Sequence, residues 1–153
     1  MGGADDAASN GGHVISKELL KLAKAILYAE VATSCLKWSA PLTLPSIANA
    51  SGSWRKHAER YKQQRGLGEM LTKTAHGHRE LAEALFYEGR AIVAMTRVAP
   101  RMLDSDNLTA CTKHVRDGIA DALGVNDRSE RVTWLPTQQR SGQASVEVEI
   151  WLW

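Results

Sequence analysis

Apolar residues recur every three or four positions between Asn107 and Leu123, and this spacing predicts an amphipathic helix. Its apolar face would carry Leu108, Cys111, Val115, Ile119 and Ala122. Gly124 follows, where a glycine is typical of the end of a helix. Asp106 comes just before the apolar pattern, so we expect its carboxylate to be the N-cap of this helix.

Strict alternation of apolar and polar residues marks the end of the chain. Val146, Val148, Ile150 and Leu152 alternate with Glu147, Glu149 and Trp151, which predicts a half-buried strand from Ser145 to Trp153. A strand is also expected from Arg131 to Gln138, and the polar turn between the two predicts an antiparallel hairpin. The largely apolar run from Ala91 to Val98 predicts a buried strand.

Four earlier segments complete the expected elements. Val14 to Ser34 has helical spacing with a lysine stripe, which we expect to be solvated. Pro41 to Asn49 predicts a short strand and turn, because its prolines exclude helix. Ser53 would cap a basic helix that is interrupted at Gly66-Leu67-Gly68, and a second helix would follow from Glu69 to Glu88.

These elements predict one small α/β domain with a mixed sheet of about four strands and helices packed on at least one face. We expect a disordered tail at residues 1–12, an additional amphipathic helix at residues 13–38 and the main domain at residues 39–153. Cys35 and Cys111 lack metal-ligand spacing, so we expect reduced core thiols and a cytoplasmic location. Three lysines and two glutamates within residues 14–34 argue against a membrane span.

Charge is distributed unevenly although the formal net charge is only +2. Residues 51–101 hold ten Lys and Arg against five Glu, whereas residues 102–153 hold five Lys and Arg against eight Asp and Glu. A basic middle beside an acidic end suits an enzyme that holds a polyanion and a metal ion. A chance drift along a chain of this length would give the same imbalance.

The basic helix after Ser53 could contact nucleic acid. Trp54, Ala58 and Tyr61 share one face, and we expect the two aromatic residues to be core anchors. The remaining faces carry Arg55, Lys56, Arg60 and Lys62. Basic residues interleaved with aromatic ones suit a phosphate backbone and unpaired bases, so we expect these four to bind DNA, together with Arg101 and Lys113.

Asp104 and Asp106 are separated by one residue, and like charges this close repel each other unless a cation, Lys or Arg offsets them. Asp127 adds a third carboxylate in the turn after Gly124. Hard cations such as Mg²⁺ take oxygen ligands of this kind, which favours a divalent metal site. The alternative is that the aspartates only cap the helix.

The run Asp104-Ser105-Asp106-Asn107-Leu108, followed by Lys113, Asp117 and Asp127, resembles the Asp-x-Asp-Asn-Leu motif of the RusA-type Holliday junction resolvases. Pro45-Ser46-Ile47-Ala48-Asn49 resembles the Pro-Ser-x-x-Asn stretch of the same family. The resemblance begins near Ser39. It implies an endonuclease of recombination and repair that cuts branched DNA as a homodimer, with Mg²⁺ as the cofactor and Mn²⁺ as an alternative.

Carried over by residue, the resemblance makes Asp104, Asp106 and Asp127 catalytic metal ligands and Lys113 a catalytic lysine. The supporting residues would be Asn49, Asn107 and Asp117. Two features depart from the family pattern. Lys113 follows Asp106 by about two helical turns instead of one, and the family's pair of acids is Asn126-Asp127 here. An ordinary surface ion pair of Lys113 with Asp117 is the alternative for the lysine.

Other chemistries are excluded by pattern. No acid lies two residues before a lysine, as restriction-type nucleases require, and there is no Walker loop or Gly-x-Ser-x-Gly elbow. We therefore expect no nucleotide cofactor. The alternative from another class is a DNA-binding protein without nuclease activity, in which the aspartates serve only as caps.

Overall fold

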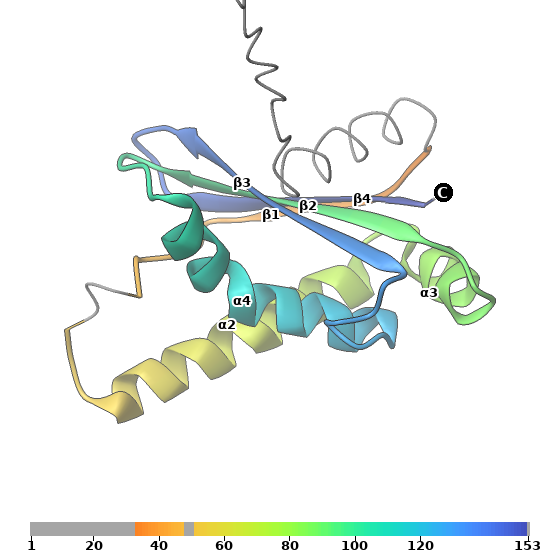
Figure 1. Ribbon diagram of the computed structural model, residues 1–153, viewed down its shortest axis with the longest axis horizontal. Helices are drawn as coiled ribbons and strands as arrows, with labels where there is room; N and C mark the ends of the chain where they lie inside the picture. Colours follow the sequence, from red (N-terminus) through yellow and green to blue (C-terminus); the bar gives the residue numbers. More distant parts are fainter. Residues whose placement is uncertain (1–32, 48–50, 153) are drawn as a thin grey trace, which may run out of the picture.

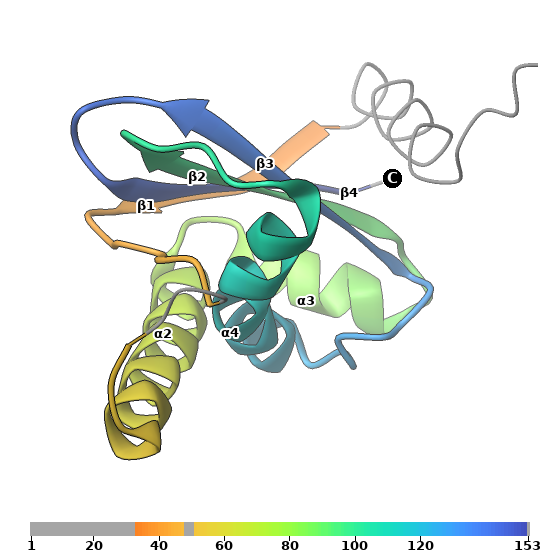
Figure 2. The same ribbon diagram turned by 60° about the vertical axis from the view of Figure 1, so that its left-hand side comes forward.

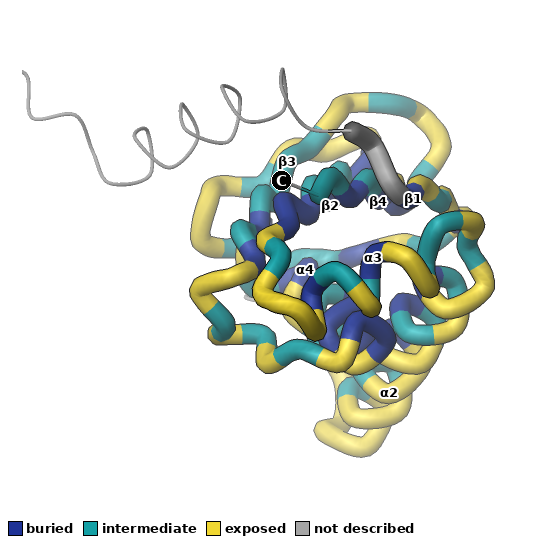
Figure 3. The backbone as a smooth tube through the Cα atoms, turned by 90° about the vertical axis from the view of Figure 1, so that its right-hand side faces the viewer, coloured by how far each residue is buried: buried dark blue, intermediate teal, exposed yellow. Residues whose placement is uncertain are grey.

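The computed structural model describes residues 33–47 and 51–152. The elements in chain order are β1 (Thr33–Ala40), α2 (Trp54–Thr74), α3 (His78–Phe86), β2 (Ala91–Ala99), α4 (Ser105–Leu123), β3 (Val132–Arg140) and β4 (Ser145–Leu152). The strands form one mixed sheet in the order β1-β4-β2-β3. α2, α3 and α4 all pack on the same face of this sheet (Figures 1 and 3). The predicted fold class is confirmed.

β2 lies at the centre of the sheet because its apolar residues can be buried. It pairs with β3 in parallel and with β4 in antiparallel orientation. Val93 and Met95 face the helices and meet Ile119 of α4 and Ile150 of β4 in one hydrophobic core. α4 connects the parallel strands β2 and β3, which makes a β-α-β unit with α4 across the sheet.

The predicted C-terminal hairpin is wrong in its pairing, although both strands exist and run antiparallel to each other. β2 lies between β3 and β4, so the two strands are joined around its end. The Ser141 backbone N–H donates to the Ala99 carbonyl, which fixes the connecting turn over the last residue of β2. Burial explains the order, because the most apolar strand gains most from a neighbour on each edge.

The first strand begins earlier than the sequence pattern indicated. β1 covers Thr33–Ala40, and the residues from Pro41 to Pro45 have no regular secondary structure. Proline has no N–H to donate to a ladder, so the strand ends before Pro41. Residues 33–38, which we assigned to the additional helix, are therefore strand. The rest of that helix and the predicted tail at residues 1–12 lie outside the described residues.

α2 continues through Gly66 and Gly68, where an interruption was predicted. A Cβ at Gly68 would lie 2.7 Å from the Val115 carbonyl oxygen of α4. Glycine is needed here for close packing of two helices rather than for a turn. The predicted second helix is correspondingly shorter, because the chain breaks at residues 75–77 and α3 begins at His78, with Gly77, whose φ is 88°, as its N-cap.

Candidate active site

α4 begins at the acidic motif, and its N-cap is Asp104 rather than Asp106 as predicted. The Asp104 carboxylate accepts from the Asn107 backbone N–H at 2.8 Å and from Asn107 Nδ2 at 2.9 Å. These hydrogen bonds hold the pKa of Asp104 below its usual range. The N-cap lies one step earlier because Ser105 and Asp106 already have helical geometry.

Asp106 occupies the first turn of α4 and is exposed. Among the described residues, its carboxylate has neither a hydrogen-bond partner nor an ion-pair partner, and Asp104 has no Lys or Arg partner. The positive end of the helix dipole partly offsets the two charges. The oxygens of Asp106 are therefore free to bind a cation from solution.

Ser46 connects the segment after β1 to the acidic motif. Its hydroxyl donates to Asn107 Oδ1 at 3.2 Å, while the other end of the same amide holds Asp104. Figure 2 shows this segment running beside the start of α4 on its way to α2. The structure thus brings together Ser46, Asp104, Asp106 and Asn107 from two distant motifs. Asn49 lies outside the described residues.

Two residues that the sequence analysis did not single out hold the loop before α4. Gln138 of β3 donates through Nε2 to the Leu103 carbonyl at 2.6 Å and accepts from the Leu103 N–H at 2.9 Å. Arg97 of β2 donates to the Arg101 carbonyl at 2.7 Å and to the Leu44 carbonyl at 2.8 Å. The one available signal was Arg97 itself, a charged residue inside a strand predicted to be buried.

Lys113 lies on the exposed side of α4 and forms an ion pair with Asp117 at 2.7 Å. This is the surface pair that the sequence analysis gave as the alternative to a catalytic lysine. His114 beside it stacks on Tyr61 of α2 at 3.9 Å between ring centroids. Burial and the neighbouring Lys113 lower the pKa of His114, so the stacked imidazole is neutral near pH 7.

Asp127 lies at the other end of α4, where its carboxylate accepts from Arg116 Nη2 at 3.3 Å. Its backbone carbonyl accepts from Trp134 Nε1 at 3.0 Å. Arg116 is about 15 Å along the helix axis from Asp106. The described residues contain no group of three His, Cys, Asp or Glu side chains that could hold a metal.

A cleft of about 910 Å³ lies between α4 and the edge strand β3. Ser105, which separates the two aspartates, lines one part of it, and Arg116 and Asp127 line another. Apolar residues of β3 and the residues Thr109 and Thr112 of α4 also line the cleft. The acidic motif and Asp127 therefore border the same cleft without meeting in it.

The four basic residues of α2 that were predicted to bind DNA lie in its first half. Arg55, Lys56 and Lys62 are exposed, and Arg60 donates to His57 Nδ1 at 2.8 Å. Arg101 is exposed in the loop before α4. The prediction that Trp54 is a core anchor is wrong, because the residue is 75% exposed. The first turn of α2 extends beyond the sheet (Figure 1), so Trp54 has no core to enter.

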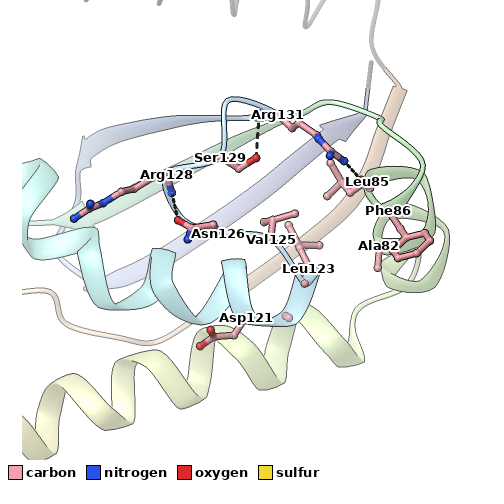
Figure 4. A pocket seen from close by; sticks show the side chains of 12 residues that line it. Ala82, Leu85, Phe86, Asp121, Leu123, Val125, Asn126, Arg128, Ser129 and Arg131 are labelled. Atoms are coloured by element: carbon pink, nitrogen blue, oxygen red, sulfur yellow. Dashed lines mark hydrogen bonds between the residues drawn. The ribbon is translucent and has the colours of Figure 1, made fainter.

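A second hollow of about 850 Å³ lies where the ends of α3 and α4 meet the loop before β3 (Figure 4). Leu85, Phe86 and Val125 form its apolar part, and Arg131 donates to the Leu85 carbonyl at 2.8 Å. It contains none of the residues predicted for the site. Cys111 is a free, buried thiol, and burial raises its pKa.

Among the described residues, no helix is long and apolar enough to cross a membrane. No family model matches this chain, and no solved structure matches it. An uncharacterized protein of Xylella fastidiosa (strain Temecula1 / ATCC 700964) is 36% identical over 114 residues, which cover 70% of this chain and 72% of that protein. At this identity and coverage, the chain belongs to the same family as the Xylella protein.

Proposed function

We propose that this protein is a metal-dependent endodeoxyribonuclease that cuts branched DNA such as four-way junctions, as its resemblance to the RusA-type resolvases implies. One observation carries the proposal. Three aspartates farther along α4 and after it pair with a cation, Asp117 with Lys113, Asp121 with Arg65 and Asp127 with Arg116. The acid pair at the start of α4 has no such partner among the described residues, so an external cation would complete it.

The residues at the start of α4 fit Mg²⁺ in part. Mg²⁺ is commonly bound through one or two carboxylates, with water and substrate phosphate completing the shell. Asp104 and Asp106 supply two carboxylates, and Asp106 has both oxygens free. Asp127 does not join them within this chain, so the site does not depend on it. When bound, a metal ion would supply an activated water and offset charge on the scissile phosphate.

The chain's own residues would bind and orient the DNA. Arg101 lies in the loop that leads directly to Asp104, where its guanidinium can hold a phosphate near the acids. The exposed basic residues of α2 would hold the backbone farther away. Two cuts on opposed strands need two acidic centres, so we propose that a two-fold homodimer is the active form. Light scattering at micromolar protein that finds an active monomer would rule the dimer out.

The alternative is a DNA-binding protein without nuclease activity. Asp104 gives it specific support, because that carboxylate does cap α4. Capping does not account for Asp106, whose carboxylate accepts no hydrogen bond among the described residues. The two functions therefore make different predictions at Asp106.

The test is cleavage of a labelled four-way junction in Mg²⁺, with binding measured separately by gel retardation in Ca²⁺. Asp106→Asn keeps the shape of the side chain and removes its charge, so cleavage should fall by at least about a hundredfold, or roughly 2.7 kcal/mol of barrier, while binding persists. Glu83→Gln removes one exposed charge on α3 and serves as the control. If the native chain binds junctions without cutting them in Mg²⁺ or Mn²⁺, the non-catalytic alternative stands.

A further inference from the structure

The loop between β2 and α4 is held from the sheet side by one amide group. Gln138 makes two hydrogen bonds to a single residue, Leu103, whose N–H and C=O it satisfies together. Leu103 directly precedes Asp104, so this pair of bonds fixes the backbone at the point where α4 begins. A side chain with one donor and one acceptor side by side is required, which Asn and Gln supply at any pH and a carboxyl group supplies only while it is protonated.

Arg97 of β2 also holds the loop before α4. Its side chain lies in the buried part of β2, with only 6% of the residue exposed. Nε donates to the Leu44 carbonyl and Nη1 to the Arg101 carbonyl, so one guanidinium joins the segment before Ser46 to the loop before Asp104. In the part of the chain that the structure describes, Arg97 has no carboxylate partner. Burying a charge costs free energy. An apolar residue at this position would avoid that cost but could not donate hydrogen bonds to the Leu44 and Arg101 carbonyls.

We propose that Gln138 and Arg97 are positioning residues that set Asp104 and Asp106 for cation binding by clamping the backbone of residues 101–103. The proposal rests on the proposed cation site at the start of α4. Among the described residues, neither side chain makes a hydrogen bond or an ion pair with the two carboxylates, so both act through the loop. Partners that orient ligands in this way typically change metal affinity by 10–100-fold when they are removed.

Gln138→Glu gives the clamp a pH signature. An ionised carboxylate accepts from the Leu103 N–H but repels the Leu103 carbonyl, because it has no proton to donate. A protonated carboxyl restores both hydrogen bonds. The ordinary pKa of Glu is about 4.3, and the facing carbonyl favours the protonated form, so the clamp should be weak at pH 8 and recover toward pH 5.

Gln139→Ala is the matched control. Gln139 is the next residue of β3, is exposed and points to the opposite face of the sheet. Three quantities are measured on the full chain: Mn²⁺ affinity by titration, hydrogen exchange of the Leu103 and Asn107 amides by NMR, and the free energy of unfolding in urea. Binding of Mn²⁺ alone tests the positioning role without requiring cleavage.

We expect Gln138→Ala to weaken Mn²⁺ binding by at least about tenfold and to speed exchange at Leu103 and Asn107. Exchange at Ile119, in the middle of α4, should stay close to native. Gln138→Glu should lose as much Mn²⁺ affinity as Gln138→Ala at pH 8. As the pH falls, the difference in Mn²⁺ affinity between Gln138→Glu and the native chain should become smaller. Arg97→Lys should also weaken Mn²⁺ binding, because a point ammonium does not reproduce the fixed fork that spans the two carbonyls.

Three results would overturn the proposal. Native Mn²⁺ affinity in Gln138→Ala, with faster exchange at Leu103, would make the clamp purely structural. Equal loss of affinity in Gln139→Ala would make the effect one of the strand as a whole. If the native chain does not bind Mn²⁺, the proposed cation site does not exist. This outcome can be told apart from failure of the clamp, because amide exchange at Leu103 measures the clamp without any metal ion.

Discussion

The two ends of α4 hold their carboxylates in opposite ways. Toward the C-terminal end, Asp121 pairs with Arg65 at 2.6 Å, and beyond that end Asp127 pairs with Arg116. At the N-terminal end, Asp104 is bound by an amide and a backbone N–H, and Asp106 has no partner among the described residues. The carboxylates at the C-terminal end of α4 are therefore neutralised by arginines, whereas those at its N-terminal end keep their negative charge.

The same contrast holds for packing. The middle and end of α4 press against α2, where Gly118 meets the backbone of Arg65 and Glu69. In the first turn of α4, Ser105 and Asp106 are exposed, Asn107 is half-buried and Leu108 is buried. A helix that is rigidly held at one end can present side chains at the other in a fixed geometry. This arrangement suits a site that binds ions or substrate, because the packed part of α4 fixes the position of the turn that carries the unpaired carboxylates.

Gly118→Ala should show the largest effect on stability. The new Cβ would lie 2.9 Å from the Glu69 backbone nitrogen and closer still to the Arg65 carbonyl oxygen, so the two helices must separate. We expect a loss of about 2–3 kcal/mol in the free energy of unfolding, measured in urea. Gly66→Ala is the control, because a Cβ there meets nothing within 4 Å, and it should stabilise the helix by roughly 0.5–1 kcal/mol. Equal effects at both glycines would show that α2 and α4 do not pack closely.

Asp127→Asn should separate structure from function at the two ends. It weakens a half-buried, charge-assisted hydrogen bond to Arg116, and we expect a loss of about 1 kcal/mol of stability. Junction cleavage at saturating Mg²⁺ should remain within threefold of native. Asp106→Asn should behave in the reverse way, with stability almost unchanged and cleavage lost. A loss of Mn²⁺ binding in Asp127→Asn would instead unite the two ends in one site, which a second copy of the chain could complete.

The apolar periodicities were sufficient to predict β2, α4, β3 and β4, because burial of each face depends on local spacing alone. Pairing was not predictable in the same way. The turn residues between β3 and β4 fit a hairpin, but the position of β2 between them depends on contacts with the rest of the sheet. Gly66 and Gly68 were interpreted as a break, because a sequence does not show whether a glycine serves a turn or a close helix contact.

For the candidate site, the sequence predicted the residues but only part of their arrangement. Ser46 and Asn107 belong to separate motifs, and the hydrogen bond that brings the motifs together was not predicted. The cap was placed at Asp106 because either aspartate suits the N-cap position by residue type. The role of Gln138 was not predictable, because its two hydrogen bonds reach a loop that is distant in sequence.

The pH dependence of stability should reveal the cap. The pKa of Asp104 is lowered in the folded chain, so the unfolded chain takes up a proton at a higher pH than the folded chain does. The contribution of Asp104 is therefore complete above the ordinary Asp pKa of about 3.9 and is lost as the pH falls through the lowered value. NMR titration of the Asp104 carboxyl carbon measures that value directly. In Asp104→Asn this titration is absent, and the acid-induced loss of protection at the Asn107 amide should be absent with it. If Asp104 titrates at its ordinary pKa, the carboxylate is not the cap in solution.

Lys113→Ala should change stability least, because it removes one exposed ion pair within a helix, which is worth a few tenths of a kcal/mol. Lys73→Ala is the control, since Lys73 also makes an exposed ion pair across four residues of a helix, with Glu69 of α2 at 2.6 Å, although there the acid precedes the lysine. Cleavage distinguishes the two lysines. A phosphate bound beside Asp106 would compete with Asp117 for the Lys113 ammonium, and the long Lys113 side chain would have to turn back toward the start of α4 to reach it. If Lys113 acts there, its replacement slows junction cleavage by at least about a hundredfold, while Lys73→Ala leaves the rate unchanged. A change of less than threefold in both would leave Lys113 as a surface partner of Asp117, and Arg101 would then be the nearest exposed cation in sequence to the acidic pair.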